Sequence, residues 1–404
     1  VPDIGQFKGH GSWHPDVLEV GGELLLSQLE NGFTLHLLPL LAPLFPEVEH
    51  LDLSGTLATI STGGLDSDGW NISGALHPDG LGLKHRTANI SVIDLFGEIP
   101  FAFSSRGENA DVARNGFVTF KQLQAGPVVG KGNYLTLKST TNHLSFVDPW
   151  KLNLAGGRIL IEDLSFGFKS ADLLVSGRTL IDSIDLKDLT QTLKLTPMQG
   201  NLTADLGDFE YIGNLLQSEG EARIDVFGGT IQIRNLKARD IFSSYRSFEG
   251  DIDFHGIDLE QLTRTFEFGE INGIIDGYIH DLRLFGKVPS AFVAEMATRD
   301  EGQRNISVKA LNNLTVISQG GLSAALSRGI YRFIDFYRYR KIGLFCVLRN
   351  DVFVLKGTAR SDSDLHLVDG GLLPPRIDIL APGTGISFRE MLHRLERIDR
   401  TTTR

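Results

Sequence analysis

Two stretches of the chain, IDLKDLTQTLKLTPMQGNLTADLGD at residues 184–208 and IDLEQLTRTFEFGEINGIIDGYIHD at residues 257–281, align without a gap. The offset is 73 residues, and the identical pairs are Ile184/Ile257, Asp185/Asp258, Leu186/Leu259, Leu189/Leu262, Thr190/Thr263, Thr192/Thr265, Gly200/Gly273 and Asp208/Asp281. A match of this length does not arise easily by chance, so it predicts a structural repeat.

A shorter landmark extends the repeat on both sides. The pattern Ile/Val-x-Ile/Val-x-x-Leu begins at residues 90, 159, 231 and 306, and its spacings are 69, 72 and 75 residues. Gly156-Gly157 and Gly228-Gly229 precede two of the four copies. We therefore expect a β-rich groove segment over 1–150, repeated units of about 73 residues over 151–321, and a helix, a β-hairpin and a capping helix over 322–404.

Alternation of apolar and polar residues is the dominant local pattern. It occurs in Leu51-Asp-Leu53, Ile224-Asp-Val226 and Asp251-Ile-Asp-Phe254, and it is typical of antiparallel strands with one dry face. Helices are predicted only at 186–193, 259–266, 322–338 and 387–399. The fold class is therefore mainly β: an elongated, curled antiparallel repeat sheet that forms an apolar groove, with a few short helices near the C-terminus. Whether the sheet closes on itself or stays an open trough is left undecided by the periodicity.

Composition excludes several classes of function. The 404 residues include 39 Lys and Arg against 50 Asp and Glu, a formal charge of −11, which is the wrong sign for a nucleic-acid groove. The sequence has no Gly-x-Ser-x-Gly elbow, phosphate-binding loop or His-Glu-x-x-His motif, so we expect no enzyme and no cofactor. His10 and His14 have a metal-ligand spacing, but Gly11 and Pro15 disfavour a helix there, and no metal site is predicted.

The landmark positions are candidates for the groove lining, because residues two apart on a strand share a face. Those expected to line the groove and contact lipid are Ile90, Val92, Ile159, Ile161, Ile231, Ile233, Ile306 and Val308.

A basic, aromatic segment stands out against the acidic chain. From Arg328 to Arg349 there are six basic residues and the single acid Asp335. An amphipathic helix over 322–341 is predicted to contact an anionic membrane surface or to cap the end of the groove. Its candidate contact residues are Arg328, Arg332, Phe333, Tyr337, Arg338, Arg340 and Lys341.

The segment from Gly256 to Met296, the run NISVKALNNL at 305–314 and the hairpin KIGLFCVLRNDVFVLKG at 341–357 resemble the C-terminal part of AsmA-like envelope proteins of the TamB, YhdP and YdbH types. These belong to the repeating-β-groove lipid-transfer proteins. The resemblance covers roughly residues 180–399, and it implies a periplasmic or cell-envelope protein that carries phospholipid acyl chains in its groove. It also implies a longer chain with an inner-membrane anchor and partners in the envelope.

The expected function is thus a non-enzymatic conduit segment for phospholipids or other acyl lipids. Two alternatives stay open: a structural scaffold for assembly of outer-membrane proteins, and transport of small acids. Transport of small acids is the less favoured of the two, because the basic residues gather at one end of the chain and not along the groove.

Overall fold

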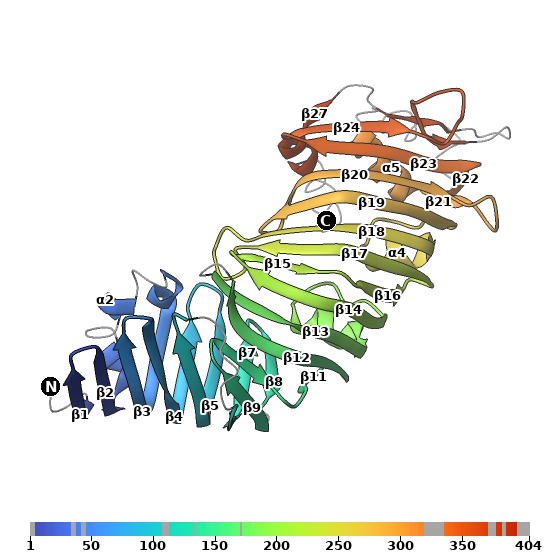
Figure 1. The fold of residues 1–404 in the computed structure, drawn as a ribbon. Helices are drawn as coiled ribbons and strands as arrows, with labels where there is room; N and C mark the ends of the chain where they lie inside the picture. Colours follow the sequence, from blue (N-terminus) through green and yellow to red (C-terminus); the bar gives the residue numbers. More distant parts are fainter. Residues whose placement is uncertain are drawn as a thin grey trace. The chain divides into compact units, whose positions relative to one another are not determined.

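The computed structural model describes residues 5–33, 38–41, 46–106, 113–132, 134–169, 172–318, 335–370, 377–381 and 385–393. Within this part of the chain, 25 strands form one antiparallel sheet, and a further pair forms a small second sheet (Figure 1). The prediction of a mainly β, antiparallel fold with a few short helices is confirmed.

Contacts divide the chain into two compact units. Unit 1 comprises Val1–Ile184, Asp205–Glu219 and Ala238–Arg246, and unit 2 comprises Asp185–Ala204, Gly220–Lys237 and Ser247–Arg404. Both consist mainly of strands that pair with their neighbours in sequence, as expected for hairpin-connected antiparallel sheets.

Unit 1 begins with a meander of five strands, β1 to β5, which lie side by side in Figure 1 and are coloured from dark blue to cyan. Its strands are β1 (Gly5–His14), β2 (Val17–Leu26), β3 (Leu51–Asp66), β4 (Gly69–His85), β5 (Ile90–Ser104), β6 (Arg114–Thr119), β7 (Gln122–Ala125), β8 (Val128–Lys131), β9 (Tyr134–Thr140), β10 (His143–Phe146), β11 (Trp150–Leu154), β12 (Gly157–Lys169), β13 (Asp172–Asp185), most of β14 (Gly200–Ile212) and β15 (Leu215–Ser218). Its helices are α1 (Leu29–Gly32), α2 (Leu38–Leu41) and the 3₁₀ helix η2 (Pro46–His50). A small core forms around Val118, Phe120, Leu135 and Leu137.

Unit 2 holds the larger core. Its strands are β16 (Glu221–Val226), β17 (Gly229–Arg239), β18 (Ser247–Asp258), β19 (Ile274–Phe285), β20 (Val288–Thr298), β21 (Asn305–Ser307), β22 (Phe336–Arg338), β23 (Lys341–Arg349), β24 (Val352–Gly357), β25 (His366–Asp369), β26 (Ile379–Leu380) and β27 (Ile386–Ser387). Its helices are α3 (Leu186–Thr192), α4 (Leu259–Thr265), α5 (Val308–Ser318) and residues 388–393. Leu348, Ile306 and Val368 lie at its centre and are at most 1% exposed.

The two aligned stretches have the same local structure. In each, a strand ends at an aspartate that caps a helix of seven residues: Asp185 caps α3 and Asp258 caps α4, through side-chain oxygens that accept hydrogen bonds from first-turn amides. A second strand follows each helix, beginning at Gly200 in one copy and one residue after Gly273 in the other. The helices predicted at 186–193 and 259–266 are therefore confirmed, within one residue.

A shared threonine explains why the two copies fold alike. The hydroxyl of Thr190 donates to the carbonyl of Leu186, and that of Thr263 to the carbonyl of Leu259, both at 2.6 Å. Each hydroxyl also accepts a hydrogen bond from the backbone N–H eight residues later, at 3.3 Å. The hydroxyl thus ties each helix to the loop that follows it, and the repeat is confirmed in structure.

The two glycines shared by the repeat copies stand where a side chain cannot be accommodated. Gly200 and Gly273 have φ of +155° and +147°, which side-chain-bearing residues rarely adopt. A Cβ atom would also collide with the carbonyl of Asp225 at the first position and with the hydroxyl of Tyr339 at the second. Both positions therefore require glycine.

Two predictions for the C-terminal third are wrong. Ile306 and Val308 do not share a strand, because β21 ends at Ser307 and Val308 begins α5. The predicted helix over 322–341 does not extend to its last residues, since Phe336–Arg338 form β22 and β23 begins at Lys341. Residues 319–334 lie outside the described part of the chain. The predicted helix at 387–399 is present over 388–393, and its remainder lies outside the described residues.

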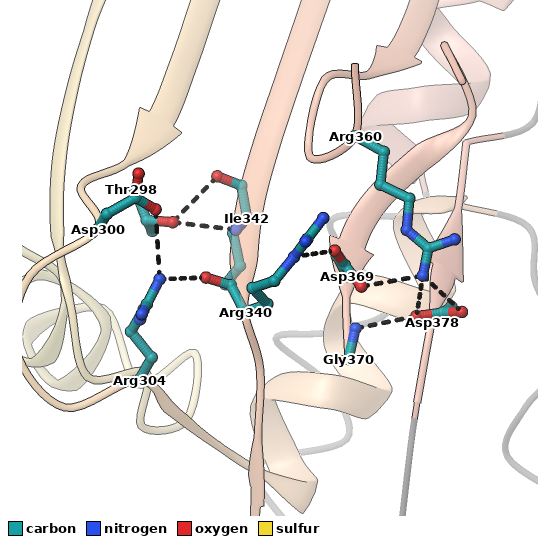
Figure 2. A network of polar contacts seen from close by, with 9 residues as sticks. All are labelled: Thr298, Asp300, Arg304, Arg340, Ile342, Arg360, Asp369, Gly370 and Asp378. Atoms are coloured by element: carbon teal, nitrogen blue, oxygen red, sulfur yellow. Dashed lines mark hydrogen bonds and ion pairs between the residues drawn. The ribbon is translucent and has the colours of Figure 1, made fainter. Parts of the chain in front are cut away.

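Figure 2 shows a polar network near the end of unit 2, which includes Thr298 and Arg304 beside β23 as well as Arg340, Arg360, Asp369 and Asp378. Asp369, which is 1% exposed, accepts hydrogen bonds from Arg340 at 2.5 Å and from Arg360 at 2.9 Å. Arg360 also approaches Asp378 at 3.4 Å, and Asp378 accepts from the backbone of Gly370. A carboxylate this deeply buried is stable only with such partners. The network therefore holds together the segments at this end of unit 2.

Candidate functional site

One face of the β1–β5 meander is mainly apolar, although β3 also places Thr59 and Ser61 on it. Directly paired residues of antiparallel strands point to the same side, and the register from β1 to β5 is regular over these rows. The rows place on this side Phe7, Trp13, Leu18, Val20, Leu24, Leu65, Trp70, Ile72, Leu76, Ile99, Phe101 and Phe103, which we call the apolar face. The opposite side carries mainly polar residues, among them Lys8, His10, Glu19, Thr62 and Asn71, although Leu25 and Ile60 also lie there.

Much of the apolar face is open to solvent. At the hairpin ends Trp13, Leu18, Leu65 and Trp70 form one cross-strand row and are 79%, 39%, 51% and 47% exposed. The next apolar row contains Val20, Ile72 and Phe103, which are all exposed as well. A contiguous exposed apolar surface is uncommon on a monomeric protein and is typical of a binding site.

The apolar face runs into a pocket of about 420 Å³ within unit 1. Leu76, Ile99, Phe101 and Phe103 of the face line one side of it. The remaining lining comes from Pro100 and Ala102 of β5, from β9, β10 and their turn, and from β12 and β13. It includes Leu144, Phe166, Phe168 and Leu173. The volume lies within the range of about 300–1,000 Å³ that is usual for small-molecule sites.

Aromatic rings shape the mouth of this pocket. The rings of Phe101 and Phe103 stack at 5.9 Å between centroids, and Phe103 meets Phe168 edge-on at 6.1 Å. Phe103, Phe168 and Leu173 are 37%, 46% and 45% exposed, so the mouth is open. Such ring pairs are favourable contacts that hold the rings in place.

Apart from the imidazole of His143, the polar side chains of the pocket lining are engaged in hydrogen bonds. The side chain of Asn142 accepts a hydrogen bond from the backbone N–H of Ser104 and donates to its carbonyl. The hydroxyl of Ser139 donates to the carbonyl of Thr140 at 3.4 Å. A ligand in this pocket would therefore meet an apolar lining with few polar groups left to bind it, which suits a hydrocarbon chain.

The residues expected to line a groove lie elsewhere. Ile90, Val92, Ile159, Ile161, Ile231 and Ile233 are all half-buried, and none lines the 420 Å³ pocket. Val92 packs against the small core of unit 1, and Ile231 against the core of unit 2. Ile306 is itself a core residue, and Val308 packs against that core from α5.

Register shows how two of these residues face. Ile231 pairs with Ile224 and Ile233 with Ala222, whereas Gln232 pairs with Arg223. The outer side of this hairpin is polar, since Arg223 hydrogen-bonds to exposed oxygen atoms of Asp225 and Thr230.

The basic and aromatic residues that were predicted to contact a membrane or cap the groove lie in different environments. Arg328, Arg332 and Phe333 lie outside the described residues. Tyr337 is 2% exposed in β22 and belongs to the interior of unit 2. Arg340 pairs with the buried Asp369, while its own side chain is 62% exposed. Arg338 is exposed, and Lys341 begins β23. The described residues thus do not form the membrane-facing helix that was predicted here.

The sequence alone did not single out the aromatic residues of the apolar face. Trp13 and Trp70 stand in ordinary alternating runs, and only the pairing of four strands brings them into one row. The signal available beforehand was the apolar residue at every second position of Leu18-Glu-Val20 and Trp70-Asn-Ile72.

Cys346 is buried, and burial raises the pKa of its thiol to about 12. Over the described ranges no three His, Cys, Asp or Glu side chains cluster as metal ligands would. None of the helices described there has the length and apolarity needed to span a bilayer.

Comparison of the chain with family models, curated proteins and solved structures gave no match.

Proposed function

We propose that the chain is a non-enzymatic lipid-binding protein that takes part in lipid transfer and holds acyl chains on the apolar face of unit 1. The observation that carries this proposal is the continuity of the exposed apolar face with the 420 Å³ pocket. The resemblance of residues 180–399 to AsmA-like envelope proteins implies the same class of ligand.

The energetics favour a mobile ligand. Burying a methylene group contributes about 0.8 kcal/mol, so a fully covered chain of sixteen carbons gains on the order of 10 kcal/mol. On an open sheet face only one side of the chain is covered, and the gain is smaller. A chain therefore binds without a deep energy minimum and can move along the face toward the pocket, where more of it is covered.

A matched pair of variants tests this proposal. Ile72 lies on the apolar face, whereas its neighbour Asn71 points to the opposite side. We expect Ile72→Asp to weaken binding of a dansyl-labelled undecanoic acid at least about tenfold, because the carboxylate would have to be desolvated beneath the chain. Asn71→Asp adds the same charge on the other side and should change the affinity less than about twofold.

The measurement is fluorescence titration of purified proteins whose circular dichroism spectra match. Native mass spectrometry of the wild-type protein should also show co-purified lipid. Equal loss of affinity in both variants, or no binding by the wild-type protein, would contradict the proposal.

An assembly scaffold is the second candidate, and one observation favours it. β1 pairs only with β2 among the described strands, and its residues Gln6–His14 are all exposed. A free strand edge of this kind can accept a strand from another protein. If the undecanoic acid does not bind but a peptide of alternating sequence protects the β1 amides from hydrogen exchange, the scaffold replaces the lipid-binding function.

A further inference from the structure

Unit 2 contains a second pocket, of about 780 Å³, that is chemically unlike the first. It lies between the β19–β20 hairpin, the β23–β24 turn and the helical residues 388–393, which are close together in Figure 1. Its apolar wall is formed by Val288, Pro289, Ala291, Leu348, Phe388 and Leu392.

The wall is rigidly held. Leu348 is fully buried, and Phe388 packs against Phe353 at 6.0 Å and against Phe292 at 6.5 Å between ring centroids. The backbone N–H of Phe388 donates to the carbonyl of Asp351, which fixes the helix on the β23–β24 turn. The pocket is therefore preformed, as ligand sites usually are.

Three arginines surround this apolar wall. For the guanidinium groups of Arg349 and Arg389, no hydrogen bond or ion pair with another described residue is found. Arg283 has one distant ion-pair partner, Glu249, at 3.9 Å and with its own side chain 63% exposed. In a chain with a net charge of −11, three guanidinium groups around one concave surface mark it as a site for an anion.

Two acids restrict the charge of that anion. Asp281 and Asp351 also line the pocket, and neither forms an ion pair with the three arginines. The five charged side chains of the lining carry one net positive charge, and Glu249, which pairs with Arg283, lies outside the lining. This charge matches a singly charged head group better than a doubly charged one.

We propose that this pocket binds an anionic amphiphile, with a singly charged phosphodiester or carboxylate head on the arginines and an apolar body over the accessible side chains of Val288 and Leu392. The site is separate from the apolar face of unit 1, so this proposal and the proposed function can fail independently.

Isothermal titration calorimetry with dihexanoylphosphatidylglycerol below its micelle-forming concentration tests the proposal. We expect the double variant Arg349→Gln/Arg389→Gln to bind at least about tenfold more weakly than the wild-type protein. Lys287→Gln removes a cation from the turn of the same hairpin but not from the pocket lining, and should bind within about twofold of wild type.

Three further results would overturn the proposal. Inorganic phosphate bound as tightly as the lipid would make the site a phosphate site, and octyl glucoside bound as tightly would make it merely apolar. Binding that Ile72→Asp abolishes but the arginine variant retains would place the lipid on unit 1.

Discussion

At the scale of single residues, charged pairs on the sheet of unit 2 set its response to pH. Asp276 on β19 accepts two hydrogen bonds from Arg299, at 2.6 and 2.7 Å, and one from the backbone of Gly256. The hydrogen bonds from Arg299 outweigh the opposing effect of burial, so the pKa of Asp276 lies below its ordinary value.

This lowered pKa leads to a prediction about acid stability. A carboxyl group whose pKa is lower in the folded protein stabilises the fold above its unfolded pKa of about 3.9, and the stabilisation is lost as the pH falls toward the folded pKa. Asp276→Asn should therefore unfold at lower denaturant concentration than wild type at pH 7, with a difference that shrinks below about pH 4.

Urea unfolding between pH 7 and pH 3 measures this difference. Asp300→Asn is the control, because Asp300 also pairs with an arginine but its side chain is 84% exposed. It should change stability by less than about 1 kcal/mol at every pH. A difference for Asp276→Asn that stays constant down to pH 3 would contradict the assigned direction of the pKa.

At the scale of elements, the repeat depends on a helix of one to two turns that is too short to be stable alone. Its order comes from the aspartate cap and from the buried threonine that joins the helix to the next loop. The same atoms do this in both copies, which explains why aspartate, threonine and glycine are among the few identities between them.

The threonine can be tested by a substitution that keeps its shape. Thr263→Val removes the hydroxyl and leaves the N–H of Ile271 without that partner in a buried place. We expect a loss of about 1–3 kcal/mol in the free energy of unfolding. Thr190→Val, in the other copy, should cost less, because the N–H of Met198 that loses this partner is only part-buried.

Thr265→Val is the internal control for this series. Its hydroxyl also donates to a helix carbonyl, Gln261 at 2.8 Å, but the bond is exposed. Water can replace it, so the expected cost is below about 0.5 kcal/mol. Equal costs at positions 263 and 265, measured by chemical denaturation, would show that the buried link to the loop is unimportant.

At the scale of the whole molecule, burial is distributed unevenly between the two units. Unit 2 has a large core that includes Leu348, Val368 and Ile379, each at most 1% exposed, whereas β1 and β2 of unit 1 expose most of their residues. A sheet whose apolar residues face water gains little stability from them, and its strands open at lower cost.

Hydrogen exchange followed by mass spectrometry should reveal this difference. We expect peptides from β1 and β2 to exchange fastest among the described strands, and peptides from β20 and β23 to exchange slowest. A saturating acyl ligand should slow exchange in β1–β5 and leave β23 unchanged, if the proposed function is right. Uniform exchange across both units would show instead that the sheet opens as a single cooperative unit.

The fold class and the repeat could be predicted from the sequence. Alternation predicted the antiparallel class, and the 25-residue match predicted a repeat whose cap, threonine and glycine all occupy matching places. These features depend on contacts between residues within about eight positions, or on the backbone conformation of one residue. A short stretch of sequence is therefore enough to predict them.

Tertiary structure alone decided where the apolar face and the buried charges lie. Whether Trp13 and Trp70 share a row depends on the register of four strands, and Asp369 meets Arg340 and Arg360 only after several strands have paired. The same holds for Ile306, whose run looked like another copy of the landmark but ends in a helix inside the core. One shift in register moves every side chain to the other face, so an alternating pattern indicates that a dry face exists but not which strands combine to form it.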